Sequence, residues 1–249
     1  MTTADAAYDG QLAPGMASRA GDRRRVRPVT AQQAVLRELR SAIIRGEIRP
    51  GEPVRQDTIA RELGVSRVPV REAMKVLEAE GQLTYEPHRG YTVTELSYDE
   101  LQELYLLRSL LEDEAIRRAI PRLDDELEAQ LHTMVEQMED MLPADDCDSA
   151  EGLVNYLELN ERFHFALFER CGVTRLVQQI RMLWRNSDAY RSVYHNDISA
   201  RHRAQVEHRE LLEACAARDV ERAVRVTTIH RDNTITMMDD VLGTQRTES

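Results

Sequence analysis

The sequence predicts a mainly α-helical protein with an N-terminal winged helix-turn-helix and a C-terminal antiparallel bundle of helices. Apolar residues recur at intervals of three and four along most of the chain, which is the period of an amphipathic helix. Only two short runs, residues 83–86 and 91–94, are rich in residues that favour strands. The 249 residues are 42% apolar, which is enough to bury two separate cores.

The expected domain boundaries follow composition and the change of period. Residues 1–28 are rich in Ala, Gly, Asp and Arg and are expected to form a tail. Residues 29–96 are expected to form the winged helix-turn-helix, residues 97–241 the helical domain, and residues 242–249 a C-terminal tail.

The two parts differ in charge. Residues 19–95 carry a net charge of +4, whereas residues 96–249 carry −13. A basic module suits contact with phosphates, and an acidic module avoids them. A chance fluctuation in composition is the alternative explanation. The chain has no apolar run long enough to span a membrane, and its three cysteines, which are far apart and odd in number, are typical of reduced thiols in a cytoplasmic protein.

In the first part, Thr30-Ala-Gln-Gln33 forms a capping box that begins a helix running to about Arg45. A second helix is expected over residues 56–63. A third runs from Ser66 to about residue 80, with Pro69 tolerated in its first turn because that N–H has no intrahelical partner. The two β-prone runs then form a two-stranded wing.

In the second part, Ser97-Tyr-Asp-Glu100 is a capping box that begins a helix running to about Ala119. Further helices are expected at residues 123–140, 150–171, 174–194, 199–217 and 220–239. A bundle of about six antiparallel helices follows.

The stretch Gly64-Val-Ser-Arg-Val-Pro-Val-Arg71 carries the clearest functional signal. The glycine ends one helix and Ser66 caps the next, while Arg67 and Arg71 are four residues apart and share a face. Forked guanidinium groups on a helix that enters the major groove read base edges. The alternative is an ordinary solvent-exposed basic face. The expected DNA-binding residues are Arg45, Arg55, Ser66, Arg67, Val68, Pro69, Arg71, Arg89 and Gly90.

These residues carry a family resemblance. Leu39-Arg-Ser-Ala-Ile-Ile-Arg-Gly46, Arg49-Pro-Gly-Glu52 and Leu63-Gly-Val-Ser-Arg-Val-Pro-Val-Arg-Glu-Ala-Met74 resemble the DNA-binding domain of the GntR superfamily of bacterial transcription regulators. The acidic helical part resembles the FadR-type, or FCD, ligand-sensing domain. The resemblance implies a homodimer on a pseudo-palindromic operator, usually a repressor released by a small metabolite. Asp57 departs from the family, because several members have a basic DNA-contacting residue near that place.

The helical part contains a polar cluster. Asn160 and His164 are four residues apart and share a helix face. His208 and His230 are equally far from the expected turn at residue 219, so two antiparallel helices place them at equal height. Such an arrangement of nitrogen and oxygen ligands suits a divalent metal such as Zn²⁺, Ni²⁺ or Mn²⁺. Ordinary surface or hydrogen-bonded core histidines are the alternative.

The resemblance adds to this metal hypothesis. Metal-binding FCD domains use an Asp-x-x-x-His pair on one helix and two later histidines, which His164, His208 and His230 match, whereas Asn160 replaces the aspartate. The metal is then expected to organise a pocket for a small effector, with a carboxylate favoured.

Arg108 and Arg185 are the expected effector-binding residues. Arg108 matches the family's Arg-x-x-Leu-Glu stretch, although a surface pair between Arg108 and Glu112 explains it equally well. Trp184 and Tyr190 line the pocket or belong to the core. His195 and His202 are expected to be exposed to solvent.

The function that best fits the sequence is a metabolite-responsive transcription regulator and not an enzyme. A metal-dependent hydrolase or lyase that uses the histidine cluster is the alternative, but it requires a water-activating carboxylate, and Glu161 points about 100° away from the face of Asn160 and His164. A nucleoid-type protein that binds DNA without an effector is a third hypothesis. The few lysines and the acidic second part speak against it.

Overall fold

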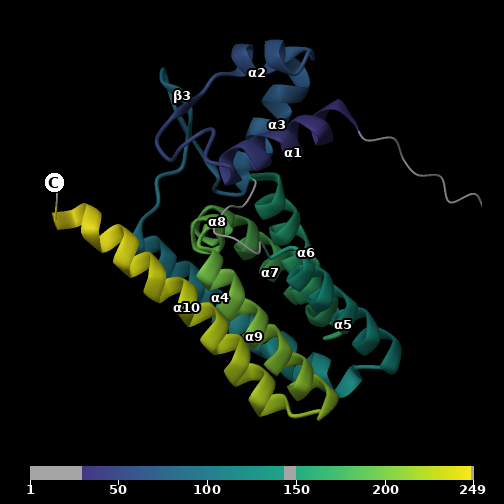
Figure 1. Ribbon diagram of the computed structural model, residues 1–249. Helices are drawn as coiled ribbons and strands as arrows, with labels where there is room; N and C mark the ends of the chain where they lie inside the picture. Colours follow the sequence, from purple (N-terminus) through teal and green to yellow (C-terminus); the bar gives the residue numbers. More distant parts are fainter. Residues whose placement is uncertain (1–29, 143–149, 248–249) are drawn as a thin grey trace, which may run out of the picture.

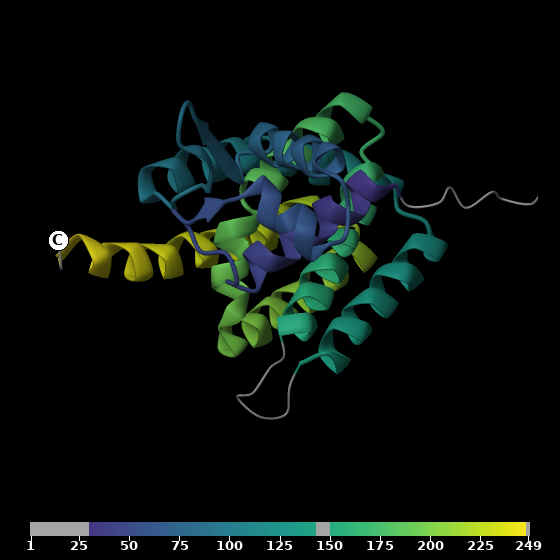
Figure 2. The same ribbon diagram turned by 90° about the horizontal axis from the view of Figure 1, so that it is seen from above.

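The computed structural model describes residues 30–142 and 150–247. The expected tail over residues 1–28 and Cys147 lie outside these residues. Figure 1 shows a small N-terminal domain lying against one end of a helical domain, and Figure 2 shows the same junction from above. The mainly helical fold with two domains confirms the sequence prediction. No helix in the described part of the chain is long and apolar enough to cross a membrane.

The N-terminal domain contains three helices, α1 (Ala31–Ile44), α2 (Gln56–Glu62) and α3 (Arg67–Ala79). The Thr30 capping box is present as expected, with both of its hydrogen bonds. Ser66 is the N-cap of α3, but its side chain makes no capping hydrogen bond, so that detail of the prediction was wrong. Buried residues from all three helices and from the wing form one apolar cluster: Val35, Leu39, Ala60, Met74, Leu77 and Leu83.

The wing is a three-stranded antiparallel sheet in the order β1-β3-β2, not the two-stranded wing expected. Strands β2 (Leu83–Glu86) and β3 (Gly90–Val93) match the two β-prone runs. Strand β1 (Pro53–Val54) is two residues long and begins with proline, so no period-2 pattern could reveal it. It pairs with Thr92 and Tyr91 of β3 and joins the wing to the segment between α1 and α2.

The described C-terminal domain is entirely helical. Its elements are α4 (Tyr98–Ala119), the short 3₁₀ turn η1 (Ile120–Arg122), α5 (Asp125–Asp140), α6 (Ala150–Glu169), α7 (Thr174–Asn186), α8 (Asp188–Asn196), α9 (Ile198–Ala216) and α10 (Val220–Thr247). The last helix was expected to end near residue 239 and to leave a tail over residues 242–249; instead it continues to Thr247.

The expected helix over residues 174–194 is broken at Ser187 into α7 and α8. Ser187 is fully buried, and its hydroxyl donates to the Trp184 carbonyl while accepting from the Arg108 guanidinium. A serine that binds a nearby carbonyl competes with the helical hydrogen bonds, and here it accompanies the break. The expected capping box at Ser97 is also absent, because the Ser97 backbone binds the Tyr190 hydroxyl instead.

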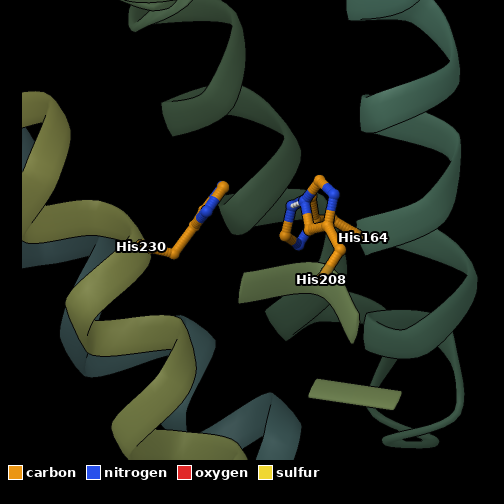
Figure 3. A group of neighbouring side chains, drawn as sticks. All are labelled: His164, His208 and His230. Carbon is orange, nitrogen blue, oxygen red and sulfur yellow. Dashed lines mark hydrogen bonds between the residues drawn. The ribbon is translucent and has the colours of Figure 1, made fainter. Parts of the chain in front are cut away.

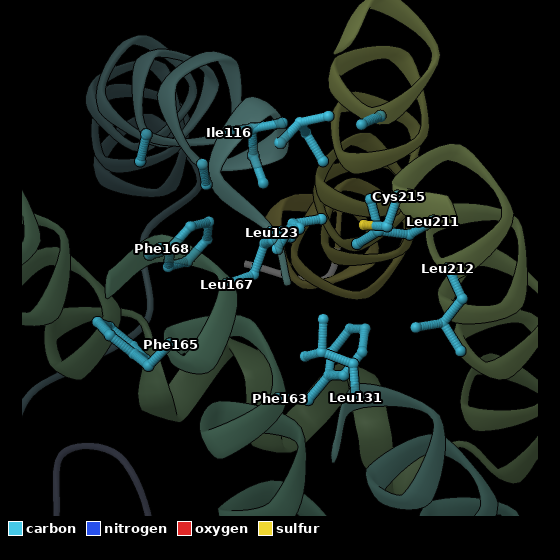
Figure 4. Packing of buried hydrophobic residues seen from close by; sticks show 14 of the residues in the cluster. Ile116, Leu123, Leu131, Phe163, Phe165, Leu167, Phe168, Leu211, Leu212 and Cys215 are labelled. Carbon is cyan, nitrogen blue, oxygen red and sulfur yellow. The ribbon is translucent and has the colours of Figure 1, made fainter. Parts of the chain in front are cut away.

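A large apolar core holds the C-terminal domain together (Figure 4), and a smaller cluster of α4, α7, α8 and α10 residues lies beside it. Ile116 of α4, Leu131 of α5 and Phe163 of α6 are fully buried in it, and Leu211 and Cys215 of α9 are almost completely buried. The core follows the three- and four-residue spacing of apolar side chains in the sequence. Around it α10 packs against α4, and α9 packs against α5 and α10.

A polar junction connects the two domains. The Glu80 carboxylate, at the end of α3, binds Arg40 of α1 and, at 2.5 Å, Arg185 of α7. The Gln82 side-chain amide donates to the Arg185 carbonyl at 3.2 Å and to Asp188 of α8 at 3.0 Å. The end of α3 is therefore tied directly to the break between α7 and α8.

Candidate DNA interface and metal centre

The first turns of α3 present an exposed surface. The Arg67 and Arg71 side chains are 71% and 55% exposed, and Val68 between them is 57% exposed. Their helix is anchored from behind by Val70 and Met74, which are buried. The arginine pair therefore projects outward from a fixed helix, which is the geometry that base reading needs.

Asp57 lies against this surface. Its carboxylate binds the Arg67 guanidinium at 2.7 Å, and both side chains are mostly exposed. Gln56 strengthens the contact between α2 and α3, because its side chain donates to the Arg67 carbonyl at 2.7 Å. Asp57 thus forms an ion pair with one of the two arginines, which the sequence alone did not reveal.

The other expected DNA-binding residues fall into two groups. Arg55, Ser66 and Pro69 lie near the start of α2 and α3, and Arg89 and Gly90 lie at the wing tip, where the Arg89 side chain is 80% exposed. Arg45 differs. Its guanidinium binds Glu38 and Glu47, and it borders a groove whose other side is formed by α8. The structure places Arg45 at the domain junction and not with the other arginines.

Three histidines meet inside the C-terminal domain (Figure 3). His164 comes from α6, His208 from α9 and His230 from α10, and one ring nitrogen of each lies within 4.8 Å of the others. The Nε2 atoms of His164 and His208 are 3.2 Å apart. The rings of His208 and His230 are 5.0 Å apart between centroids, which confirms the equal height expected from the spacing around residue 219.

Burial keeps His164 and His208 uncharged. It lowers the pKa of His164 and of His208 well below the usual value, and the neighbouring imidazoles lower both further. A neutral imidazole is the form that binds a metal. The Glu207 carboxylate accepts from Nδ1 of His230 at 2.6 Å, which fixes that ring with Nε2 directed away from Glu207.

The residues present fit a divalent metal. Two nitrogens that each lie about 2.1 Å from a tetrahedral ion are about 3.4 Å apart, close to the separation of the His164 and His208 atoms. Asn160, one turn before His164, is 1% exposed, and its side-chain oxygen has no hydrogen-bond partner in the described part of the chain. An unpaired buried carbonyl one helical turn from a histidine of the cluster is the kind of atom that completes a coordination shell.

A buried charge network lies beside the histidines. The Glu112 carboxylate of α4 binds the Arg108 guanidinium at 2.7 Å, the Arg231 guanidinium of α10 at 3.0 Å and the indole N–H of Trp184 at 2.6 Å. The Trp184 ring lies 5.1 Å from the His164 ring between centroids. Arg108 and Glu112 pair with each other, as the alternative to effector binding expected. The pair is buried and not on the surface, because each side chain is at most 4% exposed.

Three other expectations about this region have different outcomes. Arg185 does not reach the histidines, because its guanidinium points to Glu80 of the N-terminal domain. His195 was expected to be exposed and is 2% exposed, packed against the Tyr156 and Tyr194 rings. His202 is exposed, as expected. The break at Ser187 explains the error at His195, because it changes which way the residues of α8 face. Arg185 precedes the break, and its direction follows from the Glu80 carboxylate within its reach.

The sequence analysis missed several buried cations. Arg191, Arg201 and Arg231 are at most 5% exposed, yet nothing in their spacing distinguishes them from the many surface arginines of the chain. Arg191 stacks on Trp184, and together with Arg108 it is close enough to lower the pKa of His164. Two buried guanidinium groups, each paired with a carboxylate, therefore lie close to the histidine centre.

Comparison with known proteins assigns the family. Residues 31–93 match the gntR family of bacterial regulatory proteins, and residues 103–233 match the FCD domain. The chain belongs to the GntR family and carries an FCD domain. It is a DNA-binding transcription regulator with an effector-binding domain. The families and the relatives it matches are regulators, which excludes the hydrolase or lyase alternative.

Individual relatives agree with this assignment. The chain is 31% identical over 132 residues to the uncharacterized HTH-type transcriptional regulator YdhC of Bacillus subtilis, a match that covers 53% of this chain and 57% of YdhC. It is 28% identical over 199 residues to the HTH-type transcriptional repressor GlaR of Escherichia coli, covering 78% of this chain and 89% of GlaR. The solved structure of McbR/YncC from E. coli has the same fold, with 23% identity, a TM-score of 0.72 and coverage of 86% of this chain and 99% of that one.

The Glu112 network predicts a large loss of stability when its carboxylate is neutralised. Glu112→Gln leaves Arg108 and Arg231 buried with less negative charge to bind, so we expect the free energy of unfolding to fall by about 3–5 kcal/mol. Glu114→Gln is the matched control, because Glu114 is on the same helix and pairs with Arg118 at the surface; we expect its loss to stay below about 1 kcal/mol. Urea denaturation followed by circular dichroism measures both, and equal losses contradict the prediction.

Proposed function

We propose that this regulator is a cytoplasmic homodimer that binds a pseudo-palindromic operator and acts as a repressor, controlled by a small carboxylate held at a metal ion in the FCD domain. The observation that carries the proposal is the presence in one chain of an exposed arginine pair on α3 and a buried histidine centre, joined through α7. The relative GlaR is named a transcriptional repressor, which supports repression over activation.

Arg67 and Arg71 are proposed to read base edges, with Val68 making apolar contact in the same groove. Ser66 and Pro69 lie at the N-terminal end of α3 and approach the phosphate backbone. Arg55 at the start of α2 and the wing residues Arg89 and Gly90 bind phosphates or the adjacent minor groove. Arg45 has no part in this interface, because two carboxylates hold it at the domain junction.

Replacing the arginine pair tests the interface. We expect Arg67→Ala and Arg71→Ala each to weaken binding to the operator by about 1–3 kcal/mol and to relax its sequence preference. Arg225→Ala, which changes an exposed arginine of α10, should leave the affinity unchanged. Fluorescence anisotropy with DNA from upstream of the protein's own gene measures this, at two salt concentrations. Unchanged sequence-specific binding by the Arg67 and Arg71 double variant refutes the assignment.

The metal is proposed to bind His164, His208 and His230, with the Asn160 side-chain oxygen as a further ligand. A bound divalent ion supplies a Lewis-acidic position for a carboxylate or hydroxyl oxygen of the effector. Arg108 and Arg191 supply positive charge around the same place, which favours an anionic effector. Arg185 is not proposed to contact the effector, since its guanidinium points to Glu80.

Removing one histidine tests the metal centre. His208→Ala eliminates a buried ligand. We therefore expect the Zn²⁺, Ni²⁺ or Mn²⁺ content of the purified variant to be at least tenfold lower than that of the wild type. His202→Ala is the matched control, because His202 is on the same helix and is exposed. Elemental analysis after dialysis against each metal gives the content. Equal metal in both variants removes the support for the centre.

The same pair of variants tests the effector class. In metal-loaded wild-type protein and in His202→Ala, small dicarboxylates should raise the melting temperature, because a ligand that binds only the folded state stabilises it. The corresponding diamides should raise it less, and neither series should affect His208→Ala. A diamide that stabilises as well as its acid argues against a carboxylate effector.

The link from this centre to the DNA is proposed to run through two consecutive residues of α7. Trp184 packs against His164 and binds Glu112, and Arg185 binds Glu80 at the end of α3. A shift of Trp184 on effector binding displaces Arg185, since both are in the last turn of one helix. The position of α3 relative to the FCD domain changes with it.

Neutralising Glu80 tests the link. With Zn²⁺ as the probe, we expect metal binding to slow amide hydrogen exchange in both domains of the wild type, because they are joined through the shared carboxylate. In Glu80→Gln the protection should persist around α6, α9 and α10 but disappear from α3 and the wing. Glu78→Gln, an exposed neighbour, is the control. Protection of α3 that survives in Glu80→Gln places the link elsewhere.

A further inference from the structure

A groove on the N-terminal domain has an apolar floor and an acidic rim. It lies between α1, α2 and β1 and has a volume of about 510 Å³. The floor consists of side chains that are buried or half-buried: Leu39, Ala42, Ile48, Val54 and Ile59. The rim contains one guanidinium, that of Arg55, and four carboxylates, those of Glu38, Glu47, Glu52 and Glu62. Such a groove suits a segment that combines apolar side chains with positive charge.

The negative charge of the rim is only partly compensated. Arg45 pairs with Glu38 at 3.0 Å and with Glu47 at 2.7 Å. Glu52 accepts the backbone N–H of Arg49 at 3.1 Å, which brings no charge, and Glu62 is exposed. Within residues 30–142 and 150–247, neither Glu52 nor Glu62 forms an ion pair. The groove therefore keeps a net negative charge that a cation can bind.

The complementary charge lies just before α1. Residues 19–29, which precede the described part of the chain and are called the arginine-rich segment below, contain five arginines and one aspartate. Residues 30–95 carry ten basic and ten acidic residues. The whole net charge of +4 over residues 19–95 therefore belongs to this segment. Its last residues also include Val26 and Val29, which are apolar like the floor of the groove.

The segment is long enough to reach the groove of its own chain. It ends at Thr30, the N-cap of α1. Glu38 on the rim is eight residues further on, which is about 12 Å along the helix axis. Eleven extended residues span about 36 Å, so the segment can turn back at Thr30 and run beside α1. A short tether gives a millimolar effective concentration, and weak contacts are then sufficient.

We propose that the arginine-rich segment docks in the groove between α1, α2 and β1 of its own chain when no DNA is bound. Its guanidinium groups bind the rim carboxylates, and Val26 and Val29 contact the apolar floor. Docking neutralises carboxylates of the DNA-binding domain that repel phosphates. This contact involves neither the arginine pair of α3 nor the histidine centre, so it goes beyond the proposed function.

Amide hydrogen exchange of the full-length chain without DNA tests the contact. The segment variant combines Arg23→Gln, Arg24→Gln and Arg25→Gln. We expect its exchange in α2 and in the last turns of α1 to be at least threefold faster than in the wild type, because the docked segment no longer protects them. The difference should disappear in 0.5 M salt, which screens the charges. The control variant removes the same charge from three exposed arginines of the C-terminal domain: Arg162→Gln, Arg175→Gln and Arg225→Gln.

Charge reversal on the rim tests the place of docking. Glu62→Arg should speed exchange in the last turns of α1 as the segment variant does. Adding it to the segment variant should have no further effect, because either change already breaks the contact. Glu72→Arg is the matched control, since Glu72 is an exposed carboxylate of α3 that does not line the groove.

Three results overturn the proposal. The first is unchanged exchange in the segment variant; if that variant also binds DNA more weakly, its arginines serve DNA alone. The second is full additivity of the segment variant and Glu62→Arg, which excludes a contact between them. The third is protection that is lost on tenfold dilution, which assigns the segment to the groove of a second copy. None of these measurements of exchange requires an operator or a metal.

Discussion

The structure of the C-terminal domain depends on one buried carboxylate. Glu112 accepts from Arg108 of its own helix, from Arg231 of α10 and from the indole of Trp184 in α7. Burying charges is costly unless each is paired and hydrogen-bonded. The helices α4, α7 and α10 can therefore not slide or turn independently. His230 belongs to the fixed α10, and Trp184 of α7 packs against His164 of α6.

The same constraint explains how the C-terminal end of α7 contacts both domains. Trp184 is held inside the FCD domain, so the next residue, Arg185, projects from the other side of α7 toward Glu80. After the break at Ser187, α8 begins at Asp188, which binds Gln82 in the turn between α3 and β2. Two consecutive residues of α7 therefore contact the two domains. Trp184 packs against His164 inside the FCD domain, and Arg185 binds Glu80 of the DNA-binding domain.

The DNA-binding domain was largely predictable because its signals are local. Capping residues, helix-ending glycines and the spacing of Arg67 and Arg71 specify three helices without knowledge of the rest of the fold. The pairing of His208 with His230 was also predictable, because a short turn at residue 219 fixes the relative height of two antiparallel helices. The third strand of the wing was not, since β1 is two residues long and its pairing depends on a distant partner.

The sequence by itself determined the helix periods, most of the helix ends, the exposed arginines of α3 and the family to which the chain belongs. The tertiary structure alone decided that Arg185 faces the other domain, that His195 is buried and that Arg191 joins the positively charged surroundings of the histidines. For Arg185 the physical reason is the Glu80 carboxylate that the other domain brings within its reach. For Arg191 and His195 it is that the direction of a side chain after a helix break depends on what the neighbouring helices contribute. Ser187 meets Arg108 there, and the two are 79 positions apart in the chain.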